Sequence, residues 1–112
     1  MIEYYSFGEI IINGKRYTKD LIIFPDRILN NWWRKEGHKI HLEDLSDILP
    51  QKPAVLIIGT GNSGLVNIHS EIKKYIESKE IKLIAEPTSK SYQTYNQLKN
   101  KKRVIAAIHL TC

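Results

Sequence analysis

The aliphatic run from Ala54 to Ile58 constrains the fold of this chain more than any other feature of its sequence. The run contains no polar residue and lies between Pro53 and Gly59, which is typical of a strand buried on both faces of a sheet. Two further strand-like segments follow, at residues 81–85 and 104–110. Because helical patterns separate the three segments, the second half predicts a β-α-β-α-β unit with parallel strands and short connections.

The helices of this unit are indicated by apolar residues that recur at helical spacing. The first pattern runs from Ile68 to Ile76 and the second from Tyr92 to Leu98. Thr88 or Ser89 is suited to cap the second helix. A shorter amphipathic helix is expected from Leu42 to Leu49, ahead of the first buried strand.

The first half of the chain predicts a β-hairpin. A strand over residues 7–12 is followed by Asn13-Gly14 and then by a second strand over residues 15–17. Asn-Gly favours a two-residue turn in which both central residues take positive φ. A third strand is expected at residues 21–24, whereas residues 26–41 show no clear period and are interpreted mainly as a loop.

Length and composition favour one globular domain over residues 1–112. The chain is 42% hydrophobic and 26% charged, which is ordinary for a folded protein. No apolar run approaches the roughly 20 residues of a membrane span, and the N-terminus lacks the pattern of a signal peptide. The single cysteine, Cys112, can form no internal disulfide. We therefore expect a cytoplasmic protein with no membrane contact.

The net charge of +5 lies entirely in residues 54–112. A basic surplus can attract nucleic acid, but this one lacks the interleaved aromatic and basic residues of an RNA-binding sheet and any helix-turn-helix pattern. We therefore expect an ordinary lysine-rich surface and no nucleic-acid partner. Cations are also favoured at the C-terminus of the last helix, where the sequence places Lys99, Lys101, Lys102 and Arg103.

The segment Gly59-Thr60-Gly61-Asn62-Ser63-Gly64 follows the buried strand directly. Loops at the carboxyl ends of parallel strands often bind ligands, and glycines let an anion approach the backbone. The segment is neither a dinucleotide fingerprint nor a P-loop, because the third glycine does not open the helix and no Gly-Lys-Ser/Thr follows. Two interpretations stay open: a small-ligand or anion site, and a purely structural glycine turn.

No catalytic or metal-binding set is evident from spacing. His38 and His41 have no further ligand nearby, and His109 and Cys112 fall on opposite faces of the expected last strand. His109 shares its face with Ile105, which favours a packed histidine that needs a hydrogen-bond partner, either Thr111 on the same face or a nearby backbone carbonyl. We therefore predict no catalytic residue, no metal and no cofactor.

Trp32 and Trp33 are adjacent in a chain that has only two tryptophans. Neighbouring side chains point in different directions, so one ring can be buried while the other is an exposed interface anchor. The alternative is that both rings cover the edge of the sheet.

A set of short motifs runs in order along almost the whole chain. They are Phe7-Gly8-x-Ile10, Gly14, Tyr17, Asp20-x-Ile22-Ile23-x-Pro25, Trp33-Arg34, His38, Gly59-Thr60-Gly61-x-x-Gly64, Pro87-Thr88, Tyr95-Asn96-x-Leu98 and His109-Leu110-Thr111-Cys112. Each piece is weak alone, but in this order they resemble the Mth-type domain family, also called the adipogenesis-associated domain.

The resemblance implies a three-layer α/β single domain with a mixed central sheet, an N-terminal β-hairpin and a C-terminal β-α-β-α-β half. Eukaryotic relatives include a mitochondrial factor that helps to assemble respiratory complex I and a cytoplasmic protein linked to adipocyte differentiation. The family implies no established catalytic residue. It does imply a shared pocket, and our candidates for ligand-binding residues there are Thr60, Gly61, Asn62, Gly64, Trp33, Arg34, His38 and His109.

Two functional hypotheses follow. The first is a non-enzymatic binding or assembly protein that acts as an adaptor for another protein, through a surface near Trp32 and Trp33. The second is a small-molecule or anion-binding protein, or an enzyme, that uses the loop at residues 59–64 with Arg34 and a histidine. The sequence does not define an oligomeric state.

Overall fold

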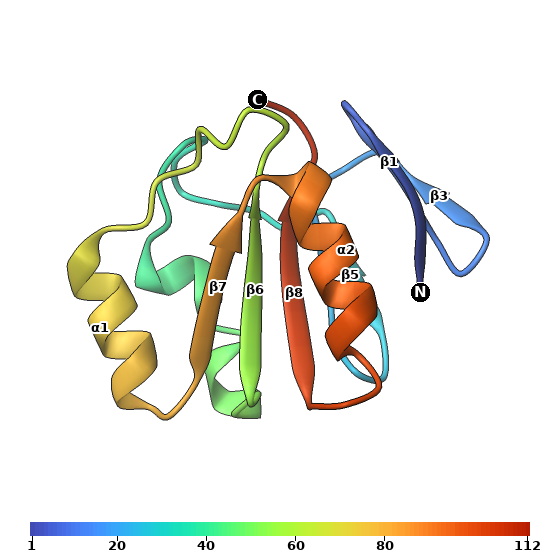
Figure 1. Cartoon of the computed structure of the whole chain (residues 1–112). Coiled ribbons are helices and arrows are strands. Elements are labelled where there is room, and N and C mark those ends of the chain that lie inside the picture. Colours follow the sequence, from blue (N-terminus) through green and yellow to red (C-terminus); the bar gives the residue numbers. More distant parts are fainter.

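The computed structural model describes residues 1–112 and contains two β-sheets and two α-helices (Figure 1). The larger sheet is mixed and has the strand order β5-β4-β8-β6-β7. Its strands are β4 (Leu21–Ile23), β5 (Ile28–Asn30), β6 (Val55–Thr60), β7 (Lys82–Glu86) and β8 (Val104–His109). The smaller sheet is antiparallel, with β1 (Ile2–Ser6), β2 (Glu9–Ile12) and β3 (Lys15–Tyr17). The helices are α1 (Ser70–Ser78) and α2 (Thr88–Leu98).

The predicted β-α-β-α-β half is confirmed. Strand β6 pairs in parallel with β7 on one side and with β8 on the other. Strand β8 also pairs antiparallel with β4, so it lies inside the sheet, and all of its residues are buried. The aliphatic character of β6 and β8 is therefore explained by layers that cover both faces.

The domain has three layers, as the family resemblance implied. Alternate residues of β6 enter two different apolar clusters: Leu56 packs with Ile76 of α1, and Ile57 packs with Tyr95 of α2. The smaller sheet lies beside α2 on that second face (Figure 1). The Asn96 side chain joins α2 to strand β1 of the smaller sheet. Its oxygen accepts from Ile2 N at 2.8 Å, and its nitrogen donates to Ile2 O at 2.7 Å.

The predicted hairpin joins β2 to β3. Asn13 and Gly14 have φ of 50° and 81°, the positive values that the two-residue turn requires. Strand β1, which the sequence analysis did not anticipate, adds to the free edge of β2. The turn between β1 and β2 lies at residues 7–8, so Phe7 is a turn residue and not the first residue of a strand.

Two expectations about local structure were wrong, and a third was incomplete. In place of one helix from Leu42 to Leu49, the chain forms two short 3-10 helices, η1 (Leu42–Leu45) and η2 (Leu49–Gln51), because the backbone bonds span three residues and Pro50 has no N–H to continue an α-helix. The loop at residues 26–41 contains β5, which is held by antiparallel pairing to β4 and not by any apolar pattern of its own. Thr88 does not cap α2, whose N-cap is Pro87. The Thr88 side chain points instead into the core.

No helix in the structure is long and apolar enough to cross a membrane.

Candidate functional site

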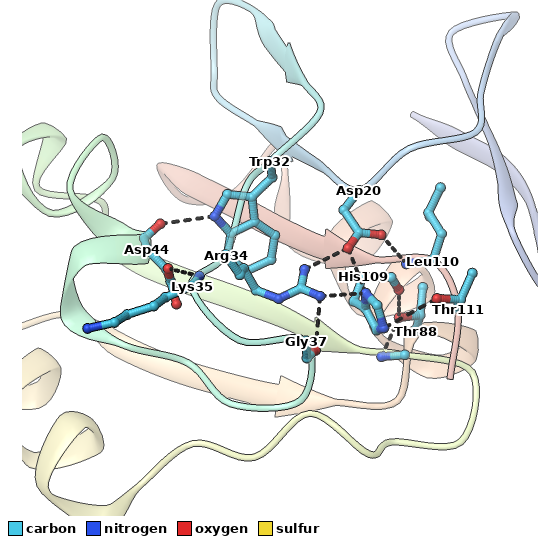
Figure 2. Close-up of polar contacts among 11 residues, drawn as sticks. Asp20, Trp32, Arg34, Lys35, Gly37, Asp44, Thr88, His109, Leu110 and Thr111 are labelled. Atoms are coloured by element: carbon cyan, nitrogen blue, oxygen red, sulfur yellow. Dashed lines mark hydrogen bonds and ion pairs between the residues drawn. The ribbon is translucent and has the colours of Figure 1, made fainter.

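Three charged or titratable side chains meet at the carboxyl end of β8: Asp20, Arg34 and His109, which we call the Asp20 cluster (Figure 2). Asp20 Oδ2 lies 2.6 Å from Arg34 Nη1 and 2.6 Å from His109 Nδ1. The second oxygen, Asp20 Oδ1, accepts from the Leu110 backbone N–H at 2.9 Å. The cluster therefore connects the segment before β4, the loop after β5 and the end of β8.

The hydrogen-bond pattern assigns the tautomer of His109. Two atoms lie close to His109 Nδ1: Asp20 Oδ2 at 2.6 Å and Arg34 Nη2 at 3.0 Å. An arginine can only donate hydrogen bonds, whereas a carboxylate accepts them. The carboxylate is the closer partner and the stronger acceptor, so Nδ1 carries the proton and donates to Asp20, while Arg34 Nη2 donates to the Gly37 carbonyl at 3.0 Å. His109 Nε2 then accepts from the Thr111 hydroxyl, 3.5 Å away.

Asp20 is held in its ionised form. Burial by itself would raise the pKa of this carboxyl group, but hydrogen bonds from His109, from the Leu110 N–H and from Arg34 outweigh burial and lower the pKa below its ordinary value. The sequence analysis expected Thr111 or a backbone carbonyl as the partner of His109. The main partner is Asp20.

The Arg34 guanidinium is buried between polar and aromatic groups. Its carbon lies 4.9 Å from the ring centre of Trp32, whose indole N–H donates to the Asp44 carbonyl at 2.9 Å. Arg34 Nε is buried and has no hydrogen-bond partner. Trp32 is thus the buried ring of the tryptophan pair, with 5% of its surface exposed, whereas Trp33 is 72% exposed.

The glycine loop packs against the end of the chain. Gly61 has φ of +100° and is buried, and a Cβ there would overlap the Thr111 carbonyl oxygen and lie 2.9 Å from His109 Cδ2. The Thr88 hydroxyl accepts from Gly61 N at 3.0 Å and donates to the His109 carbonyl at 2.6 Å. Glycine is therefore required at this position both for its φ and for the close approach of the chain terminus.

The loop leaves the carboxyl end of β6, as expected, but its N–H groups do not form an open anion cradle. Asn62 N donates to Thr111 O at 3.2 Å, and Gly64 N donates to Gly61 O at 3.2 Å. A hollow of about 320 Å³ nevertheless lies beside Thr60. It is lined by Thr60, Ser63, Gly64, Val66, Asn67, Ile68, Lys73, Ala85 and Pro87.

In space, the Asp20 carboxylate, the His109 imidazole and the Thr111 hydroxyl lie one after another, which is the order of groups found in acid–base relays. The arrangement differs from a working relay in two respects. Arg34 already neutralises the carboxylate, and none of the cavities in the structure is lined by Asp20, Arg34 or His109. The geometry therefore fits a cluster that holds the end of the chain in place.

The structure brings some of the predicted site residues together and separates others. Gly61, Arg34 and His109 surround one buried polar region, while Thr60 and Gly64 line the adjacent hollow. Three of the candidates lie at the surface: Asn62, His38 and Trp33.

Sequence reasoning did not nominate Asp20 or Thr88 as site residues. Asp20 is a lone carboxylate ahead of an apolar run, and its partner His109 is 89 residues away, so spacing gave no sign of the pair. Thr88 at the start of a helix resembles an ordinary cap. The only signal for both was their presence among the residues that carry the family resemblance.

Three large exposed apolar side chains lie on loops that are bonded to the Asp20 cluster or to the terminal residues beside it. Phe7, Trp33 and Leu65 are 61%, 72% and 55% exposed, and we call them the loop-end surface. Phe7 precedes Gly8, whose N–H donates to Leu110 O at 2.9 Å, and Trp33 precedes the buried Arg34. Leu65 follows the glycine loop, which bonds to Thr111. The tip of the β1–β2 hairpin and the loop after β6 both lie near the C-terminus in Figure 1.

Comparison with known proteins agrees with this architecture. The family model described as a protein of unknown function (DUF498/DUF598) matches residues 2–109. A conserved hypothetical protein from Pyrococcus horikoshii has a crystal structure that superimposes with a TM-score of 0.89 at 32% identity, covering 100% of this chain and 99% of that one. MT938 superimposes with a TM-score of 0.80 at 25% identity, covering 100% and 98%. A search of the curated proteins found no match.

A more distant solved structure shares the same fold. A Bordetella pertussis protein, described as a Mth938-like domain, has a TM-score of 0.67 at 18% identity, covering 98% of this chain and 85% of that one. The fold and the buried cluster thus define a small three-layer α/β domain with two sheets. The chain belongs to the DUF498/DUF598 family, the Mth-type domain that the sequence motifs had suggested.

Proposed function

We propose that this protein is a non-enzymatic binding domain that acts as an adaptor or assembly factor and docks on another protein through the loop-end surface. The observation that carries the proposal is the exposure of Trp33 at 72% beside a neighbour, Trp32, that is almost fully buried. A cytoplasmic location is part of the same proposal.

The backbone around Trp33 is well suited to present an interface anchor. Trp32 is fixed by its bond to Asp44 O, and Arg34 is fixed by Asp20. Trp33 therefore stands on a segment held on both sides, so that binding would order little beyond its own two side-chain torsions. Tryptophan is also among the residues enriched at energetic hot spots of interfaces.

The other two side chains lie on loops at the same end of the domain. Phe7 and Leu65 lie on separate loops that both bond to the terminal segment, Phe7 through Gly8 to Leu110 and Leu65 through Asn62 to Thr111. Their joint exposure favours a partner that presents an apolar side chain or ridge. The assembly role of eukaryotic relatives, implied by the family resemblance, supports a protein partner as well.

The experiment is site-specific photo-crosslinking in cells of the source organism or a close relative. A photoreactive phenylalanine analogue would replace Trp33 in one variant and Tyr75 in a matched control. Tyr75 is also an exposed aromatic residue, but it lies on α1 beside η2, away from the terminal segment. We expect a discrete protein adduct from position 33 and none of that mass from position 75. Identical adducts from both positions, or none from position 33, would contradict the proposal.

A second candidate function rests on the hollow beside Thr60. Its lining residues include Thr60, Ser63, Asn67 and Lys73, whose hydroxyls, amide and ammonium are a combination suited to a small polar or anionic ligand. The bonded N–H groups of the glycine loop argue against backbone recognition of that ligand. Native mass spectrometry of the purified protein separates the two candidate functions. A bound small molecule that is absent from Lys73→Gln would favour ligand binding in the hollow. A bound protein that is absent from Trp33→Ala would favour docking through the loop-end surface.

A further inference from the structure

A second cavity lies at the opposite end of the larger sheet, beside the first residue of β8. Its volume is about 280 Å³, and its inner wall includes Ile23, Val104 and the buried Tyr95. Four cationic side chains line it: Arg27, Lys99, Lys102 and Arg103. They come from the β4–β5 turn and from the segment that joins α2 to β8, so two distant parts of the chain converge on one site.

The cations in this cavity are not neutralised within the protein. No aspartate or glutamate lines the cavity, and neither Lys99 nor Lys102 takes part in any ion pair of the structure. Arg27 has only a long pair with exposed Asp26, at 3.5 Å. Since like charges around a shared cavity repel one another, a bound anion would remove an unfavourable interaction as well as form new bonds.

The two arginines are held in position before any ligand binds. The Arg27 guanidinium carbon lies 4.1 Å from the ring centre of Phe24. The backbone carbonyl of Arg27 accepts from Phe24 N at 2.8 Å. Arg103 donates through Nε and Nη2 to Gln51 at 3.4 and 3.3 Å. Side chains that are already ordered lose less entropy on binding.

Neutral donors complete the lining. The Tyr95 hydroxyl has no hydrogen-bond partner within the protein, and burial raises the pKa of Tyr95, so the hydroxyl keeps its proton. The amide of Asn100 also lines the cavity. The site thus combines several cations and neutral donors with an apolar wall.

We propose that this cavity binds a small phosphate ester, with the phosphate contacted by Lys99, Lys102 and Arg27 and the organic part against the apolar wall. Phosphate suits the site because a dianion with several acceptor oxygens matches clustered cations and donors. The volume lies near the lower limit of ligand pockets, which fits a small molecule. The site is separate from the loop-end surface.

The proposal gives three of the C-terminal cations a role beyond ordinary surface charge. Lys99, Lys102 and Arg103 line the cavity, whereas Lys101, which the sequence analysis grouped with them, does not. Lys101 is therefore an internal control of the same charge in the same segment.

The test uses the full chain in buffer free of phosphate and sulfate, with phenyl phosphate, inorganic phosphate and a short single-stranded DNA as probes. Isothermal titration calorimetry gives affinities, and amide shifts in nuclear magnetic resonance spectra locate the contact. We expect saturable binding of phenyl phosphate, at least about threefold tighter than inorganic phosphate because the phenyl ring contacts the apolar wall. Amide shifts should centre on residues 24–28 and 98–104.

The variants Lys102→Gln and Lys99→Gln should each weaken phenyl phosphate binding by about threefold to tenfold, and Lys101→Gln should leave it unchanged. Unchanged melting temperatures would show that all three variants fold. The proposal is overturned if phenyl phosphate binding does not saturate, or if Lys101→Gln loses as much affinity as the other two variants. It is also overturned if inorganic phosphate binds as tightly as phenyl phosphate. Tighter binding of the DNA than of phenyl phosphate would overturn it too, in favour of a nucleic-acid surface.

Discussion

His109 Nδ1 lies 2.6 Å from Asp20 Oδ2, although 89 residues separate the two in the chain. The contact crosses between the neighbouring strands β4 and β8, near their ends, and draws in Arg34 from a third segment. The surface loop that carries Trp33 is thereby tied to the last residues of the chain, and the loop before Leu65 is tied to them separately, through Asn62 N and Thr111 O. The stability of this junction and the shape of the loop-end surface are consequently coupled.

Loss of the Asp20 charge should destabilise the fold strongly. In Asp20→Asn the buried Arg34 guanidinium loses its carboxylate partner, and removal of one member of a buried pair costs about 3–5 kcal/mol. Because Asp20 remains 20% exposed, we expect the lower part of that range. Urea unfolding measures the change, with Asp26→Asn as an exposed control within about 0.5 kcal/mol of wild type. Equal stabilities of the two variants would show that the cluster contributes nothing.

The same carboxylate predicts an acid-sensitive component of stability. The pKa of Asp20 is lower in the folded state than its ordinary value of 3.8, so its contribution is complete above that value and is lost as pH falls through the folded pKa. The difference in unfolding free energy between wild type and Asp20→Asn should therefore become smaller as the pH is lowered from about 6 to about 2. A difference that stays constant over this range would mean that Asp20 is not held ionised by its partners.

Gly61 should tolerate no side chain. In Gly61→Ala the new Cβ would overlap the Thr111 carbonyl oxygen, and the φ of +100° would be strained in any residue other than glycine. We expect a loss of at least about 2 kcal/mol in unfolding free energy. Gly37→Ala is the matched control, because nothing lies within 4 Å of a Cβ there and its φ is not in the positive range. The interpretation fails if both variants unfold at the same denaturant concentration.

Removal of residues 109–112 should destabilise the whole domain. His109 and Leu110 are buried, the Leu110 N–H donates to Asp20, and the Leu110 carbonyl accepts from both Gly8 N and the Tyr5 hydroxyl. We expect a large fall in melting temperature, or no folded protein at all. Cys112→Ser, which changes only the terminal side chain, should melt like wild type. A stable truncated protein, together with rapid labelling of Cys112 by thiol reagents in the folded full chain, would instead indicate a dispensable reactive tail.

The sequence predicted those parts of the fold that rest on local pattern. The aliphatic strands at β6 and β8 and the Asn13-Gly14 turn each follow from a short stretch of residues, and each was confirmed. Strand β5 was missed because pairing with β4 forms it, and pairing leaves no periodicity in so short a segment. The helix expected from Leu42 was wrong in type, because the backbone bonds span three residues, as from Asp44 N to His41 O and from Ser46 N to Glu43 O, and Pro50 has no N–H to continue a helix.

The candidate site was predicted in part for a similar reason. The glycine spacing correctly located a loop at the end of β6, and the apolar neighbours of His109 correctly indicated burial. The identity of the partner could not be read from the chain, because Asp20 and His109 come together only through the antiparallel pairing of β4 with β8. Likewise, sequence left open which tryptophan is exposed, since the answer depends on the distant carbonyl of Asp44 that binds Trp32.

The docking proposal is tested most directly by calorimetric titration of the crosslinked partner, once purified, against wild type, Trp33→Ala and Tyr75→Ala. Both substitutions remove an exposed aromatic ring, so neither should change the melting temperature by more than a few degrees. We predict that Trp33→Ala weakens the complex at least about 30-fold, equivalent to about 2 kcal/mol at an interface hot spot, and that Tyr75→Ala leaves the affinity unchanged. An unchanged affinity in Trp33→Ala, or an equal loss in both variants, would contradict a binding role for the loop-end surface.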